Sequence, residues 1–255
     1  MSGQLLEVKD VYRFFGGLTA LSNVSFVIMP QTTVGVIGPN GAGKTTLFNL
    51  ITGVIPCSQG NIFFKGQQIT SLEEYKIARL GVSRTFQKVQ LFHHLNVLQN
   101  IMVGAQMQYK SDFLSAAIPG KRMREEEEKI LNRSLEILKL IGLEHKAHFV
   151  PENLPVGEQK LLEIGRALAT EPELLLLDEP AAGLNDNEIE VLEQLIFRTR
   201  KLGITILLVE HRMGLVMKVS DRIVVLNYGK KIADGTPEQI QQDSVVIAAY
   251  LGEKG

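Results

Sequence analysis

The sequence has few of the features that cross-link a protein, anchor it or steer it by charge. Cys57 is the single cysteine among 255 residues, which excludes an internal disulfide and a cysteine-based zinc site. The 27 Lys and Arg residues nearly cancel the 28 Asp and Glu residues, so we expect no general affinity for nucleic acid or acidic lipid. No apolar run approaches the ~20 residues of a membrane span, and residues 1–4 carry neither a basic region nor an apolar signal core. We therefore expect a soluble, cytoplasmic chain.

The sequence does contain a glycine-rich loop between an apolar run and a helical run. It fits the phosphate-loop pattern G-x-x-x-x-G-K-[ST] and consists of Gly38, Pro39, Asn40, Gly41, Ala42, Gly43, Lys44, Thr45 and Thr46. Residues 33–37 before it predict a buried strand, and residues 47–51 after it begin a helix. Glycines let the backbone turn its N–H groups toward anionic oxygens, so we expect Lys44 to reach the β- and γ-phosphates of a nucleotide and Thr45 to bind Mg²⁺. A glycine-rich turn without a ligand is the alternative, and the flanking strand and helix disfavour it.

The segments around this loop predict a second, smaller sheet. Residues 5–12, 23–29 and 60–65 alternate apolar and polar side chains, which is typical of half-buried antiparallel strands, and residues 14–17 read as a turn. Phe15, at the tip of this turn, is placed to stack on an adenine, an interaction worth ~1 kcal/mol beyond area burial. Burial of the Phe15 ring in the core is the alternative.

Two acidic residues follow a strand that is apolar on both faces. The four leucines at 174–177 predict a parallel strand covered on both sides, so Asp178 and Glu179 lie at its carboxyl end, where open α/β sheets place their ligands. Asp178 suits a water-mediated contact with Mg²⁺. Glu179 suits orienting or deprotonating the attacking water, which is worth ~10²–10⁴ in rate. His211 follows the next buried strand, 204–209; we expect it at the same edge, contacting the γ-phosphate, with a structural role as the alternative.

The region between these sites has a different pattern. A short helix over 72–80 precedes a strand over 81–87 that ends on Gln87. Helices are predicted over 97–105 and 121–141, with a loop over 112–120, and in the second helix Leu131, Leu135 and Leu138 follow helical spacing. We divide the chain into a nucleotide-binding core with the β subdomain (1–87 and 160–235), a helical subdomain (88–159) and a polar helical tail (236–255).

Taken in order, these features resemble the ATP-binding subunit of ABC transporters over essentially the whole chain. The ordered landmarks are the loop Gly38–Thr46, Gln87, the segment Leu154–Glu158, the strand Leu174–Pro180 and His211. Within that family, residues 84–87, 178–185 and 249–253 look like the subgroup that powers uptake of branched-chain and other hydrophobic amino acids. The resemblance implies an α/β fold: a P-loop NTPase (RecA-like) core with a small antiparallel β subdomain and an inserted α-helical subdomain.

The resemblance also implies a mechanism, with ATP and Mg²⁺ as cofactors. Two such chains, identical or related, face head to tail, and each ATP lies between one phosphate loop and the other chain's signature segment, here Pro155, Val156, Gly157 and Glu158. Gln87 belongs beside the metal and the reacting phosphate, and its loop passes the opening of the dimer to transmembrane permease subunits. An extracytoplasmic substrate-binding protein feeds those subunits, and the ATPase lies at the cytoplasmic face of the membrane.

One departure from the family lies in the signature segment. The family usually has a serine where this chain has Pro155, and proline supplies neither a hydroxyl nor an N–H. We expect Asn153 to cap the following helix instead. We also expect Glu158, in place of the commoner glutamine, to add negative charge near the nucleotide.

Three other functions share part of this pattern. An ATPase for lipid or lipopolysaccharide export is disfavoured by residues 181–185 and by the insertion at 112–128. A soluble ABC protein of translation or DNA repair is disfavoured because the sequence has no second cassette, long coiled coil or basic patch. A regulatory subunit with low turnover is suggested only by Pro155, and it is disfavoured by the presence of Lys44, Asp178, Glu179 and His211.

Overall fold

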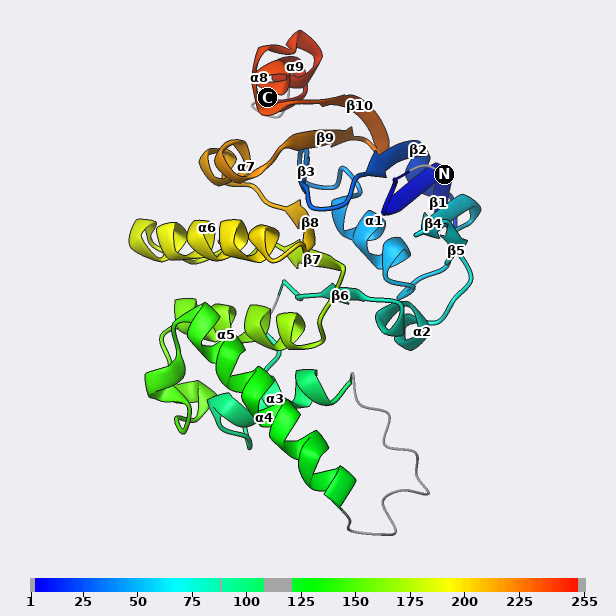
Figure 1. Cartoon of the computed structure of the whole chain (residues 1–255). Helices are drawn as coiled ribbons and strands as arrows, with labels where there is room; N and C mark the ends of the chain where they lie inside the picture. The colour runs from blue at the N-terminus through cyan, green and yellow to red at the C-terminus, as the bar shows by residue number, and fades with distance from the viewer. Residues whose placement is uncertain (1–2, 88, 108–120, 252–255) are drawn as a thin grey trace.

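The computed structural model describes residues 3–87, 89–107 and 121–251, and a six-stranded sheet forms the centre of the protein (Figure 1). The strand order is β10-β9-β3-β8-β7-β6, formed by β10 (Lys230–Gly235), β9 (Arg222–Asn227), β3 (Thr33–Ile37), β8 (Thr205–Val209), β7 (Leu174–Asp178) and β6 (Val82–Arg84). All neighbours are parallel except β10, which pairs antiparallel with β9. The carboxyl ends of β3, β7 and β8 therefore meet at one edge, as the sequence predicts.

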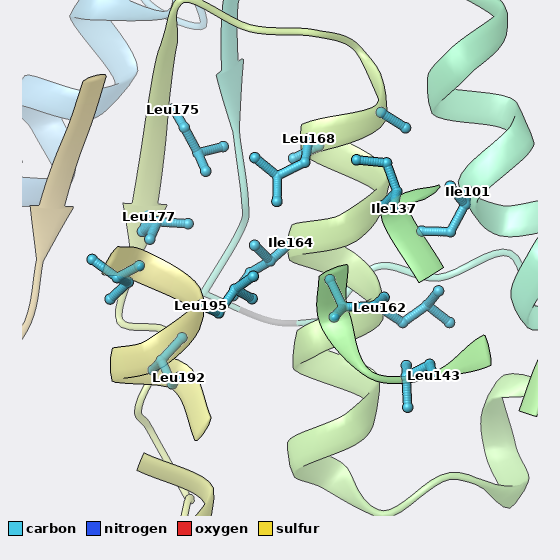
Figure 2. Close-up of a cluster of buried hydrophobic side chains, with 14 of the residues drawn as sticks. Ile101, Ile137, Leu143, Leu162, Ile164, Leu168, Leu175, Leu177, Leu192 and Leu195 are labelled. Atoms are coloured by element: carbon cyan, nitrogen blue, oxygen red, sulfur yellow. The ribbon is translucent and has the colours of Figure 1, made fainter. Parts of the chain in front are cut away.

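The leucine strand β7 is buried on both faces because alternate side chains enter two different cores. Leu174 and Leu176 pack with α1 (Lys44–Ile51) and the antiparallel strands. Leu175 and Leu177 pack with α5 (Val156–Ala169) and α6 (Asp186–Lys201), as Figure 2 shows. Burying a leucine fully is worth roughly 1.5–3 kcal/mol, so these residues hold the carboxyl end of β7 firmly in place.

A second sheet has the order β2-β1-β4-β5 and is antiparallel throughout. It consists of β2 (Leu18–Ile28), β1 (Leu6–Phe15), β4 (Gln59–Phe64) and the short β5 (Gln67–Gln68). The predicted sheet is confirmed, but β1 and β2 are longer than predicted: Phe14 and Phe15 belong to β1, and only Gly16 and Gly17 form the turn. The pairing extends because Phe14 and Phe15 oppose Thr19 and Leu18.

The helical part packs α3 (Val97–Gln106), α4 (Lys121–Ile141) and α5 together below the sheet in Figure 1. Helix α4 is confirmed, but the face inferred from its leucine spacing is wrong. Ile130, Ile137 and Leu138 are buried, whereas Leu131 and Leu135 are 38% and 44% exposed. Leucine spacing alone could not identify the buried face, because isoleucines on the adjoining face fill the core. The loop predicted over 112–120 lies outside the described residues.

Shorter elements complete the chain. They are α2 (Glu74–Arg79), the 3₁₀ turns Glu144–Lys146 and Pro151–Asn153, α7 (Met213–Val219), α8 (Pro237–Gln242) and α9 (Ser244–Leu251). The tail is helical as predicted, but it is not polar throughout, since Ile240 and Val246 are buried against β9. Within the described residues, no helix is both long and apolar enough to cross a membrane.

Candidate functional site

The phosphate loop connects β3 to α1 in a conformation that requires its glycines. Gly38, Gly41 and Gly43 have positive φ angles of 149°, 75° and 102°. A Cβ at Gly38 would lie 2.0 Å from the carbonyl oxygen of Leu226, and one at Gly43 would lie 2.6 Å from Leu21 Cδ2. Lys44 is 6% exposed and donates to the carbonyl oxygens of Gly38 and Pro39 at 2.6 and 2.8 Å, which closes the loop on itself. The loop is thus a preformed cradle of backbone groups at the start of a helix.

A cavity of about 330 Å³ lies over this loop. It is lined by the predicted residues Phe15, Asn40, Gly41, Ala42, Gly43, Lys44, Thr45, Thr46, Glu179 and His211, together with Leu18, Thr19 and Ala20. Phe15 is 43% exposed, with the Arg13 guanidinium 4.4 Å from its ring centre, so the alternative that this ring is buried in the core is wrong. The cavity therefore joins an exposed aromatic ring, the phosphate loop and two groups suited to hydrolysis.

Glu179 lies between Gln87 and His211. Its Oε2 accepts a hydrogen bond from Gln87 Nε2 at 3.0 Å, and its Oε1 lies 3.0 Å from His211 Nε2. In the chain, Gln87 follows β6, Glu179 follows β7 and His211 follows β8. Gln87 lies three residues beyond the end of β6, whereas the sequence predicted that it would end this strand. Glu179 has a φ of 49°, an uncommon left-handed conformation for a residue with a side chain, which is held by a 2.8 Å bond from its N–H to the Val209 carbonyl.

Asp178 has a partner that sequence reasoning missed. Its Oδ2 accepts a 2.7 Å hydrogen bond from Arg84 Nη2, and the two side chains are 2% and 8% exposed. Arg84 also donates to Asn49 of α1 at 2.6 Å, and its guanidinium lies 5.5 and 5.4 Å from the Phe48 and Phe86 rings. Nothing in the sequence connects the two residues, because β6 and β7 become neighbours only in the folded sheet.

Three further buried charges surround Glu179 and were also missed. Lys160 of α5 donates to the carbonyl oxygens of Glu179 and Pro180, both at 3.2 Å. Glu163, one turn further along α5, accepts the N–H groups of Phe86 and Gln90 at 3.4 and 3.3 Å. Glu210 accepts the N–H of Ala181 at 2.6 Å and the N–H of His211 at 2.8 Å. Only Glu210, a charged residue directly after a buried strand, carried a sequence signal.

Comparison with known proteins shows the family to which this sequence belongs. The family described as ABC transporter matches residues 21–182, and the one described as Branched-chain amino acid ATP-binding cassette transporter matches residues 230–255. This chain belongs to the ABC transporter family.

Individual relatives cover the whole chain. It is 46% identical over 254 residues to LivG, the high-affinity branched-chain amino acid transport ATP-binding protein of Escherichia coli strain K12. The matched residues cover 99% of this chain and 100% of LivG. It is 42% identical over the same length to BraF, the corresponding protein of Pseudomonas aeruginosa. A crystal structure of the ADP conformation of an ATP-binding cassette from an ABC transporter is 30% identical, with a TM-score of 0.85 over 98% of this chain and 100% of that one. The protein is therefore an ATPase subunit of a transporter, and the predicted P-loop fold is confirmed.

The signature segment of this ABC protein begins α5. Pro155 is the N-cap residue of α5, and no side chain caps the helix, so the expected cap by Asn153 is wrong: Asn153 ends the preceding 3₁₀ turn instead. Val156 is 57% exposed. Gly157 packs so closely on the capping box of α6 that a Cβ would lie 2.4 Å from Glu188 Oε1.

The charge expected from Glu158 is balanced within the chain. Its two carboxylate oxygens each accept a hydrogen bond from Lys146 Nζ at 2.6 Å. The negative charge expected from Glu158 therefore has the Lys146 ammonium beside it in this conformation. Of the described residues, those from Pro155 to Glu158 do not line the phosphate-loop cavity. The structure brings the other predicted site residues together and leaves the signature segment facing outward at the start of α5.

The groups available for Mg²⁺ are few. Among the described residues, no three His, Cys, Asp or Glu side chains come together as a metal site. Thr45 is exposed at the phosphate loop and Asp178 has one carboxylate oxygen engaged by Arg84. Hydroxyl and carboxylate oxygens suit Mg²⁺, which takes a few protein ligands and completes its shell with waters and phosphate oxygens. The residues present fit such a site.

Proposed function

We propose that this chain hydrolyses ATP to drive the uptake of branched-chain or other hydrophobic amino acids through separate membrane subunits. The observation that carries the hydrolytic part is the position of the Glu179 carboxylate, between Gln87 and His211 at the wall of the phosphate-loop cavity. The similarity to LivG and BraF over the whole chain supports the substrate class.

Glu179 is the group we assign to the attacking water. A carboxylate whose two oxygens are held by Gln87 and His211 has a fixed direction, and the left-handed backbone at Glu179 fixes its starting point. A positioned carboxylate of this kind accepts a proton from water or orients it for in-line attack. We assign His211 to the γ-phosphate, where its ring also holds Glu179 in place.

The phosphate loop binds the nucleotide. Lys44 exchanges its bonds with the Gly38 and Pro39 carbonyls for phosphate oxygens, while the backbone N–H groups of the loop point at the same oxygens. Thr45, Asp178 and Gln87 would hold Mg²⁺, which when bound neutralises charge on the phosphates. The exposed Phe15 ring stacks on the adenine.

A second cassette completes the site, since the signature segment of this chain points away from its own nucleotide cavity. Solved cassettes include a dimeric one bound to ADP and Pi, which shares 26% identity with this chain. In our proposal Pro155, Val156, Gly157 and Glu158 contact the nucleotide of the partner, whether a second copy or a related ATPase. The dimer works against permease subunits at the cytoplasmic face of the membrane, with an extracytoplasmic binding protein delivering substrate and no nucleic acid involved.

The test is Glu179→Gln, which keeps the size of the side chain and removes its basicity. We expect MgATP binding to persist, turnover to fall by ~10²-fold or more and the ATP-bound dimer to accumulate on size-exclusion chromatography. Cells that depend on this chain should lose uptake of labelled leucine, isoleucine and valine when it carries the substitution. Near-normal turnover would mean that Glu179 is not the general base, and His211 would be the next candidate. Unchanged leucine uptake despite lost turnover would refute the substrate class.

A further inference from the structure

Helix α5 presents two buried and oppositely charged side chains to the hydrolytic edge of the sheet. Lys160 is 8% exposed and Glu163 is 4% exposed. They stand three residues apart, so they lie on the same side of the helix. The same helix begins with the signature segment at Pro155. One rigid element thus touches the Glu179 turn, the Gln87 loop and the surface assigned to the partner's nucleotide.

Lys160 holds the backbone of the Glu179 turn. Its ammonium donates to the carbonyl oxygens of Glu179 and Pro180 at 3.2 Å each, next to the left-handed φ of Glu179. Burial lowers the pKa of Lys160, while the neighbouring carboxylates of Glu210, Glu163 and Glu179 act in the opposite direction. Burial therefore acts against a charge on Lys160, whose side chain donates to two carbonyls of this turn.

Glu163 holds the Gln87 loop from both sides. Its Oε1 accepts the N–H of Phe86, one residue before Gln87, and the N–H of Gln90, three residues after it. Burial raises the pKa of Glu163, and the two N–H groups oppose this effect. Burying a carboxylate to hold a surface loop is a poor way to stabilise a fold, because removing a charge from water is unfavourable. A role in the geometry of the site accounts for its presence better.

We propose that Lys160 and Glu163 are positioning residues that together set the contact between Gln87 and Glu179. Glu163 fixes the loop that carries Gln87, Lys160 fixes the turn that carries Glu179, and both are mounted on α5. The 3.0 Å bond between Gln87 and Glu179 then depends on where α5 stands. A displacement of the signature segment at one nucleotide reaches Gln87 and Glu179 at the other through this helix. The inference rests on the roles proposed above for Gln87 and Glu179.

The test measures MgATP hydrolysis by the full-length chain in its complex, which is purified by means of this chain. Glu163→Ala and Lys160→Met should each lower kcat roughly tenfold to a hundredfold, the effect of a small misplacement, while KM for ATP stays within about twofold. Glu163→Gln retains an oxygen that can accept an N–H, so it should recover most of the rate. Glu193→Gln is the matched control, because Glu193 is also a buried carboxylate on a helix, 6% exposed, but pairs with Lys218 of α7. It should keep wild-type kcat.

A double-mutant cycle separates positioning from a general loss of structure. If Glu163 acts through Gln87, Glu163→Ala should lower the rate no further when Gln87→Ala is already present. The inference is overturned if the two losses multiply, if Gln87→Ala alone keeps wild-type kcat, or if the α5 variants behave like Glu193→Gln. If Glu163→Ala fails to fold, the kcat of Lys160→Met is compared with that of Lys160→Arg, which keeps a positive charge and should recover most of the rate. Near-normal turnover in Glu179→Gln would instead refute the proposed role of Glu179, so the two failures are distinguishable.

Discussion

Arg84 Nη2 and Asp178 Oδ2 form a 2.7 Å ion pair in which both side chains are almost fully buried. The pair joins β6 to β7 one residue before Glu179, and Arg84 extends it to Asn49 of α1. The Asp178 carboxylate, which we assign to Mg²⁺, is therefore held in place by Arg84 of β6, the strand that leads to Gln87.

Removing Arg84 should destabilise the protein and raise its requirement for Mg²⁺. Arg84→Met leaves the Asp178 charge buried without its partner, and breaking a buried pair in this way costs ~3–5 kcal/mol. The matched control is Arg200→Met, because the Arg200–Asp221 pair has similar geometry at 2.6 Å but side chains 35% and 40% exposed, where such a pair is worth about 0–1 kcal/mol. Denaturant unfolding and the Mg²⁺ concentration at half-maximal turnover are the measurements. Equal losses of stability in the two variants would show that the buried pair has no special weight.

Phe15→Ala should weaken ATP and ADP binding to the same extent, because adenine is common to both. Loss of stacking worth ~1 kcal/mol corresponds to about a fivefold rise in Kd. Phe14→Ala is the matched control, since Phe14 is the next residue on β1, is 38% exposed and packs on Tyr12 outside the cavity lining. Fluorescence titration with each nucleotide gives the answer. An unchanged Kd in Phe15→Ala would assign the ring to the Arg13 contact alone.

Phe92→Asp should uncouple transport from hydrolysis. Phe92 is 47% exposed at the entry to the helical part, with the Arg166 guanidinium 5.1 Å from its ring centre, so a charge there disturbs a surface and not the core. We expect ATPase activity of the isolated chain to change little while amino acid uptake by the assembled transporter is lost. Leu202→Asp, 60% exposed at the end of α6, should affect neither. Lost ATP binding in Phe92→Asp would place this residue in the nucleotide site.

Pro155→Ser should stabilise α5 and speed the partner's site. Pro155 already has the extended backbone of an N-cap, with φ −53° and ψ 153°, and a serine there adds a cap worth ~1 kcal/mol. The hydroxyl also adds a hydrogen bond to the nucleotide across the dimer. If this chain pairs with a different ATPase, single-turnover hydrolysis in dimers with one site disabled should show a gain at the site that uses this signature segment and none at the site that uses Lys44 and Glu179. Equal rates before and after the change would mean that the N–H groups of Val156 and Gly157 suffice.

The sequence alone determined the parts of this protein that are encoded locally. The glycines of the phosphate loop take positive φ angles that favour glycine, and the run of leucines before Asp178 encodes a strand buried on both faces. Because the carboxyl ends of parallel strands meet at one edge of a sheet, the sequence also predicted that Glu179 and His211 lie together. Each of these inferences depends on spacing along the chain, which is visible without a structure.

Tertiary structure decided the contacts between segments far apart in the chain. Arg84 and Asp178 are separated by 94 residues, and Phe86 and Glu163 by 77, so no spacing rule connects them. The same limit explains the error over α4, whose Leu131 and Leu135 fit a helical stripe although α3 and α5 cover a different face. It also explains why the bond from Lys146 to Glu158 could not be predicted. Local sequence fixes which groups are available, and the packing of α5 against the sheet edge decides which of them meet, because buried charges take their partners from whatever the fold brings within hydrogen-bond distance.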